Sequence, residues 1–248
     1  MLLLILLSGA AAPLASCELV AWLLRLRHRW RVYRVPFGIG LVVAVILVTA
    51  ETRLDPSLMA IGGTPQRALA LAFLLGALPE ELLKLLGFLV WLWAGGGGDP
   101  RHRLVGAVAV AMGFDMIETW LQLWQWADRP ELWLAMLAQR ALLAAPMSAV
   151  GGFVVGVWSA ATPEARGGTF ARNLGIGWLA AVLAHGVWDG SVFVALGRLG
   201  AQDAAGAAAA AVPGLLGAAA IGGSAIVVGL RRAGGMRRLR EGETDDRS

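Results

Sequence analysis

The sequence has few charged side chains: Asp, Glu, Lys and Arg make up 15% of its 248 residues, against about a quarter in an average soluble domain. Hydrophobic residues make up 58%, and apolar runs of about 20 residues recur, each long enough for a helix to cross a hydrocarbon core of about 30 Å. These runs lack the two-residue alternation of a transmembrane β-barrel, and the composition excludes intrinsic disorder and collagen. The sequence therefore predicts an all-α, polytopic integral membrane protein surrounded by a lipid bilayer.

Cysteine is almost absent, since Cys17 is the only one, and this excludes an internal disulfide and a metal site built from cysteines. The formal charge of +4 and the pI near 10.5 are compatible with nucleic-acid binding, but the arginines stand in short segments between the apolar runs. We interpret these arginines as topology signals and expect no nucleic-acid partner.

About seven transmembrane helices are predicted. All lie in one membrane domain, residues 1–230, which is followed by a charged cytoplasmic tail, residues 231–248. The predicted spans run roughly over residues 2–24, 35–51, 67–94, 104–126, 131–160, 174–197 and 206–230.

The distribution of arginine predicts the orientation in the membrane. Alternate connections place 15 arginines on one side and four on the other, and the arginine-rich side of a membrane protein is normally cytoplasmic. The N-terminus is therefore expected outside and the C-terminus inside. Lipoprotein cleavage before Cys17 is an alternative, because Leu14 to Cys17 fit such a site, but it inverts the later spans and contradicts the arginine count.

Ionisable side chains inside the predicted spans need a partner or a function, because each costs about 2.5–3.5 kcal/mol at the bilayer centre on insertion scales. Three spans carry them at a similar depth, near the bilayer midplane by the helical rise. They are Glu80, Glu81 and Lys84 in the third span, Asp115 and Glu118 in the fourth, and His185 and Asp189 in the sixth. We expect these groups to converge on one site.

Helical spacing gives each group a common face, since Glu80 and Lys84, and likewise His185 and Asp189, are four residues apart. Pro79 lacks an N–H and its ring crowds the preceding turn, so a kink is expected just before Glu80. A kink there opens room for water, and a carboxylate beside it can serve as a general base.

Three motifs stand in order on separate predicted spans: Glu80-Glu81-x-x-Lys84, Phe114-x-x-x-Glu118 and His185-x-x-x-Asp189. Together they resemble the PrsW family of glutamic-type intramembrane proteases, within the CAAX-protease and bacteriocin-processing superfamily. The resemblance covers roughly residues 65–200. It implies a helical membrane fold that holds a carboxylate-activated water, with no cofactor and no metal.

By this resemblance, Glu80 is the base that deprotonates the attacking water, and Glu81 tunes or orients it. Lys84 balances the charge of the two glutamates. Glu118 holds or polarises the same water from the facing helix, at a position where the wider superfamily often has histidine. Phe114 belongs to the same motif and is expected to support the site.

His185 and Asp189 are then expected to stabilise the oxyanion and to pass a proton to the leaving amine. Arg140 and Pro146 resemble the fifth span of the family, although the histidine expected near Ser148 is missing. The resemblance further implies a multi-pass protein of the bacterial inner membrane and a single-span membrane protein as substrate, such as an anti-sigma factor.

Several alternatives stay open from the sequence. The cluster can be a set of interhelical ion pairs in an inactive scaffold, or a divalent-cation site, because three carboxylates and an imidazole suit such an ion. A His-Glu-x-x-His motif is absent, which argues against the usual zinc-dependent membrane proteases. A proton- or cation-coupled transporter is the alternative function, although no second half matches the first as in inverted-repeat transporters.

Overall fold

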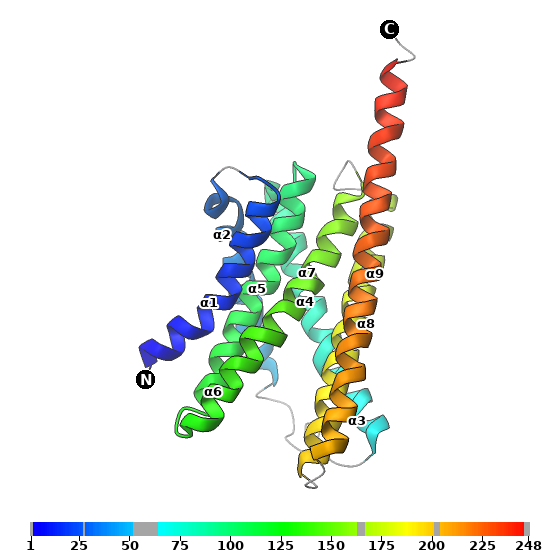
Figure 1. Ribbon diagram of the computed structural model, residues 1–248. Coiled ribbons are helices and arrows are strands. Elements are labelled where there is room, and N and C mark those ends of the chain that lie inside the picture. Colours follow the sequence, from blue (N-terminus) through cyan, green and yellow to red (C-terminus); the bar gives the residue numbers. More distant parts are fainter. Residues whose placement is uncertain (1, 27, 52–63, 163–166, 201–203, 246–248) are drawn as a thin grey trace.

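The computed structural model describes residues 2–26, 28–51, 64–162, 167–200 and 204–245, and all secondary structure in these ranges is helical (Figure 1). Nine α-helical and three π-helical segments occur there. The α-helices are α1 (Leu2–Leu23), α2 (Arg29–Glu51), α3 (Pro65–Leu71), α4 (Leu78–Trp91), α5 (Pro100–Gln125), α6 (Pro130–Gln139), α7 (Ala145–Ala160), α8 (Gly168–Gly200) and α9 (Ala204–Asp245). The π-helical segments are η1 (Ala72–Ala77), η2 (Leu92–Gly96) and η3 (Arg140–Ala144). The predicted all-α fold is confirmed.

The central helix of the bundle is α5, most of whose residues are buried between α1, α2, α4 and α7. Two of its neighbours approach it closely through glycine. A Cβ on Gly113 of α5 would lie 2.1 Å from the carbonyl oxygen of Phe37 in α2, and one on Gly156 of α7 would lie 2.8 Å from Cα of Leu104. Because small residues let helix backbones touch, these positions fix α5 as the scaffold on which site residues are placed.

Within the described ranges, six helical segments are long and apolar enough to cross a membrane. They are Leu3–Leu23, Arg29–Ala50, Pro100–Gln125, Leu132–Ala160, Gly168–Ala195 and Ala209–Ala233. The predicted third span, 67–94, is not among them, because it carries Glu80, Glu81 and Lys84 within five residues. That segment is helical throughout, divided into α3, η1, α4 and η2. The chain is a multi-pass membrane protein, and the count of seven spans stays a prediction.

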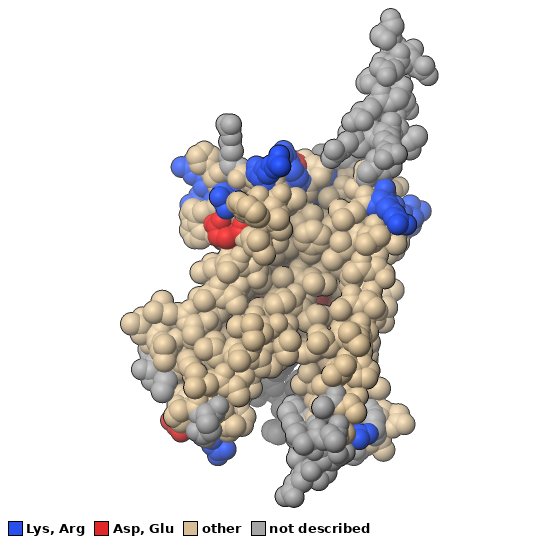
Figure 2. Space-filling view, viewed as in Figure 1, with Lys and Arg blue, Asp and Glu red and all other residues tan. Residues whose placement is uncertain are grey.

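The two ends of the bundle differ in the number of basic side chains on the face shown in Figure 2. The α1–α2 connection, the start of α5, the end of α7 and the last turns of α9 lie at one end (Figure 1). Figure 2 shows basic side chains at both ends, with more of them at the end where α9 leaves the bundle. The surface between the two ends is almost free of charged side chains. That the arginine-rich end is cytoplasmic stays a prediction. Helix α9 continues to Asp245, so most of the predicted tail is helical.

Candidate active site

The helix that carries the two adjacent glutamates is widened just before them. Segment η1 ends at Ala77, and Pro79 is the second residue of α4. Pro79 has no N–H to bond with Leu75 and its ring crowds that carbonyl, which disfavours an ordinary α-helical turn at this point. A π-helical turn takes its place. The kink expected at Pro79 stays a prediction; the structure has a π-helical segment there, and Glu80 and Glu81 lie in the first turn of the helix that follows it.

Lys84 pairs with both glutamates of its own helix. Its Nζ lies 2.8 Å from Oε1 of Glu81 and 3.4 Å from Oε2 of Glu80, and all three side chains are buried. The same Nζ lies 4.5 Å from the ring centroid of Phe114 on α5. Phe114 thus contacts the lysine cation from the facing helix. The aromatic residue of the second motif therefore packs against the lysine of the first.

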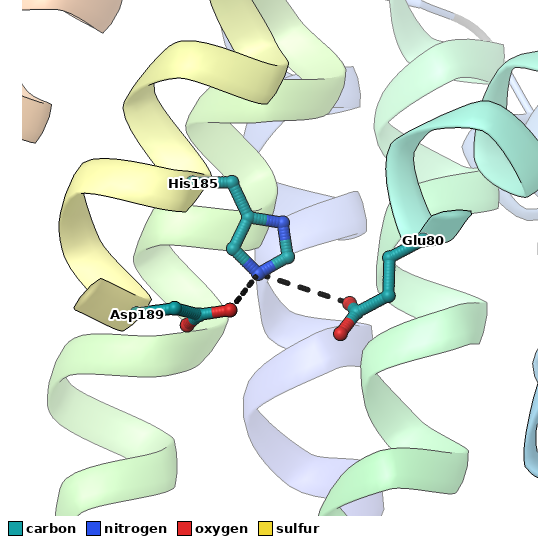
Figure 3. A group of neighbouring side chains, drawn as sticks. All are labelled: Glu80, His185 and Asp189. Atoms are coloured by element: carbon teal, nitrogen blue, oxygen red, sulfur yellow. Dashed lines mark ion pairs between the residues drawn. The ribbon is translucent and has the colours of Figure 1, made fainter. Parts of the chain in front are cut away.

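The imidazole of His185 links α8 to α4 (Figure 3). Its Nδ1 lies 2.9 Å from Oε1 of Glu81, while its Nε2 lies 3.1 Å from Oδ2 of Asp189 and 3.8 Å from Oε2 of Glu80. Both ring nitrogens therefore face carboxylate oxygens, an arrangement that an imidazolium satisfies with two donors. The first and third motifs converge as the sequence predicts.

Glu118 belongs to a second network, in which Arg140 from η3 binds one face of α5. Nη2 of Arg140 donates to Glu118 Oε2 at 3.1 Å and to Oδ1 of Asp115, and Nε donates to Thr119 Oγ1 at 3.0 Å. Ser148 Oγ donates to the same oxygen of Asp115 at 3.3 Å. Asp115 is fully buried, whereas the side chain of Glu118 is 30% exposed.

Both networks border one small pocket, with about 40 Å³ of space for the centres of water molecules. Its polar lining consists of Glu81, Glu118, Arg140, Ser148, His185 and Asp189, and its apolar lining of Ala144, Met147, Gly151, Ala181, Ala184 and Trp188. Glu80 is not among these lining residues, but it contacts His185, which is. The pocket gives water a place beside carboxylates that the apolar helices otherwise enclose. In Figure 2 an acidic side chain is visible in a hollow midway between the charged ends.

Some of these residues were not predicted as part of the site. The sequence places Asp115 among the groups expected to converge but gives it no role, points to Ser148 only through the histidine missing beside it, and gives no role to Thr119. A signal was present, because Asp115, Glu118 and Thr119 are spaced i, i+3 and i+4 and so share one face of α5. Gly76 was also missed; a Cβ there would lie 3.2 Å from Asp189 Oδ2, so η1 packs directly against that carboxylate.

Comparison with known protein families shows which family the chain belongs to. The model of a family described as PrsW family intramembrane metalloprotease matches residues 28–219. The chain belongs to the PrsW family. It is therefore an intramembrane protease that acts on a membrane protein within the lipid bilayer. No curated protein and no solved structure matches the chain. The resemblance stated from three motifs is confirmed, over a longer stretch than the roughly 65–200 they covered.

The description of the PrsW family includes a metal, and one group of side chains in the described part of the chain fits such an ion. One ligand atom each of Glu80, His185 and Asp189 lies within 4.8 Å of the other two. One imidazole with two carboxylates is a donor set that suits zinc and other divalent metals. Glu81 accepts from Nδ1 of His185, as the carboxylate behind a metal-bound histidine commonly does. The residues present are compatible with a metal ion at Nε2.

Proposed function

We propose that this PrsW-family protein hydrolyses a peptide bond of a single-span membrane protein, such as an anti-sigma factor, in the bacterial inner membrane. The attacking group is a water activated by glutamate in the pocket beside His185. The observation that carries the proposal is the imidazole of His185 held between Glu81 and Asp189, with Glu80 at 3.8 Å, at the wall of a pocket inside the helical bundle. Peptide hydrolysis needs such a set: a base, a proton carrier and access for water.

Glu80 is the base in this proposal because it is held less firmly than Glu81. The contacts of Glu81 with Lys84 and His185 are 2.8 and 2.9 Å, whereas those of Glu80 with the same two residues are 3.4 and 3.8 Å. Short charge-assisted hydrogen bonds fix a carboxylate and occupy its lone pairs. Glu81 is therefore suited to orient His185 and Lys84, and Glu80 retains the freedom to accept a proton from water.

The remaining residues bind water and move the proton. Glu118 lines the pocket from α5 and its side chain is 30% exposed, so it can hold the water opposite the imidazole. His185, between Glu80 and Asp189, lies on the short path that carries a proton from the base to the leaving amine. Both of its nitrogens already face carboxylates, so donation to an oxyanion requires one of these contacts to break.

A divalent cation, when bound by Glu80, His185 and Asp189, supplies Lewis-acid polarisation and makes a water more acidic. In that case Glu80 is a ligand and the base is one of the other pocket carboxylates; without a metal, Glu80 is the base. We propose the metal-free form. The family match gives no support to the transport alternative.

The test is proteolysis of a panel of single-span membrane proteins by purified protein in detergent, with and without EDTA. Glu80→Gln and Glu81→Gln are compared with wild type after each variant is shown to be folded. Glu18→Gln is the matched control, because Glu18 contacts Tyr33 and Arg29 at the α1–α2 end and lies outside the pocket.

Cleavage by wild type and Glu18→Gln that survives EDTA, and is lost in the two site variants, supports glutamate-based hydrolysis. Loss of cleavage in EDTA, restored by added zinc, replaces it with the metal-dependent form. Equal cleavage by wild type and both folded site variants contradicts the proposed site.

A further inference from the structure

The proposed hydrolysis leaves one catalytic task without a residue. A tetrahedral intermediate carries a negative oxygen, and donors already aimed at that oxygen contribute strongly to catalysis. His185 has both nitrogens against carboxylates, and Lys84 is bonded to two glutamates. Among the described residues that line the pocket, Arg140 is the remaining cationic donor.

We propose that Arg140 is a catalytic residue whose Nη1 donates hydrogen bonds to the oxyanion of the tetrahedral intermediate. This inference rests on the proposed hydrolysis. The Nε and Nη2 edge of the guanidinium is bonded to Asp115, Glu118 and Thr119, whereas Nη1 forms no hydrogen bond with another described residue. Arg140 lines this pocket and also a smaller one beside α1, and the two N–H groups of Nη1 are the donors that it has left for a ligand.

The guanidinium is held in place before any substrate arrives. Asp115 and Thr119 are buried, lie one helical turn apart on α5, and bind two different nitrogens of Arg140. Asp115 accepts a further hydrogen bond from Ser148 of α7, so the network joins three segments of the bundle. A donor fixed in this way does not have to reorganise when charge develops, which is the condition for effective oxyanion stabilisation. Asp115 and Thr119 are thus positioning residues for Arg140.

The chemical step is an ordinary hydrolysis. The water oxygen forms a bond to the carbonyl carbon while its proton moves to Glu80, and the carbonyl π electrons become a lone pair on oxygen that accepts from Nη1 of Arg140. That lone pair then re-forms the carbonyl as the C–N bond breaks, and the leaving nitrogen takes the proton by way of His185. The new carboxyl group then loses its proton to the new amine, so the products are one carboxylate terminus and one ammonium terminus, with no other reactant.

The test compares Arg140→Lys and Arg140→Ala with wild type, using a cleaved substrate and a phosphinic peptide that mimics the tetrahedral oxyanion. Arg103→Lys is the matched control, since Arg103 is also a buried arginine but binds the carbonyl oxygens of Ser159 and Thr162 at the far end of α7. We expect kcat to fall about 10²–10³-fold in both Arg140 variants, with KM nearly unchanged. Inhibition by the phosphinic peptide is expected to weaken in parallel, and added guanidinium is expected to restore part of the activity of Arg140→Ala.

The outcomes separate this inference from the function on which it rests. If wild type cleaves no substrate, the proposed function fails and the inference fails with it. If wild type cleaves and both folded Arg140 variants keep their kcat, or change only KM, the inference alone is wrong. Should Arg140→Ala not fold, Asp115→Asn takes its place: a lowered kcat with unchanged KM supports the inference, and an unchanged kcat contradicts it.

Discussion

Lys84 and Phe114 lie on different helices and form a cation–π contact, with the Nζ of the lysine 4.5 Å from the ring centroid. The lysine is also the counter-ion of Glu80 and Glu81. Through Phe114, α5 stabilises the lysine that neutralises the two glutamates of α4. This contact gives the aromatic residue one turn before Glu118 a structural role.

Replacement of that aromatic residue is expected to lower both stability and activity. Phe114→Leu removes a desolvated cation–π contact and part of a buried side chain, for a loss of about 2–4 kcal/mol in the free energy of unfolding. Phe114→Tyr is expected to keep most of it. Phe170→Leu, at a buried ring of α8 in another cluster, is the control. If the two leucine variants lose stability equally and both keep full activity, the contact with Lys84 has no special role.

Removal of the counter-ion has a larger expected cost. Lys84→Met leaves the buried Glu80 and Glu81 without their cation, and uncompensated buried charges typically cost about 3–5 kcal/mol. The double variant Lys84→Met with Glu81→Gln is expected to recover part of that loss, because it also removes one buried negative charge. Equilibrium unfolding in mixed detergent micelles measures both values, and a double variant less stable than Lys84→Met contradicts the assigned pairing.

Two glycines near the site make a matched pair. A methyl group on Gly76 would lie 3.2 Å from Asp189 Oδ2, so Gly76→Ala is expected to push Asp189 from His185 and to lower kcat several-fold. The same change at Gly151 places the methyl group 3.7 Å from Glu81 Oε2, an ordinary contact, and is expected to be tolerated. Steady-state cleavage rates of the two variants test this prediction. Equal rates would show that Asp189 can move to accommodate the methyl group without loss of activity.

Metal content can be measured apart from activity. For the metal-free form we expect elemental analysis of the purified protein to give much less than one divalent ion per chain, and no difference between wild type and His185→Ala. One ion per chain in wild type that is lost in His185→Ala or Asp189→Asn instead assigns Glu80, His185 and Asp189 as ligands.

The single cysteine makes the orientation testable. Cys17 is fully buried, and a Cys17→Ala background has no thiol. In intact bacteria we expect a membrane-impermeant maleimide to label Asp128→Cys, in the turn between α5 and α6. Gly98→Cys, at the arginine-rich end, is expected to react only after permeabilisation. The reverse pattern would place the arginine-rich end outside.

Helical periodicity was enough to predict which site residues share a face, because residues four apart on a helix lie together whatever surrounds them. It could not predict partners across helices. That Glu81, and not Glu80, makes the short contact with His185 depends on how α4 is rotated against α8. The pairing of Arg140 with Asp115 likewise depends on the approach of η3 to α5, which no local pattern specifies.

The predicted third span shows where prediction of membrane helices from composition is limited. Composition and length predict membrane helices well where the helix is apolar, and six of the predicted spans correspond to such helices. The segment that holds Glu80, Glu81 and Lys84 departs from that composition because it carries the candidate active site. Pro79 predicts a kink from local chemistry alone, whereas the π-helical form of the turn before it also depends on the packing of η1 against α8.

The π-helical turn before Pro79 has a consequence for helix register. A π-helical turn holds about one residue more than an α-helical turn, so η1 acts as a one-residue insertion between α3 and α4. If this turn became regular α-helix with the same number of residues, Glu80 would rotate by about 100° relative to α3, since each α-helical residue turns the chain by that angle; deleting one residue as well would restore its direction. The number of residues in the π-helical turn therefore sets the direction in which Glu80 and Glu81 face relative to α3.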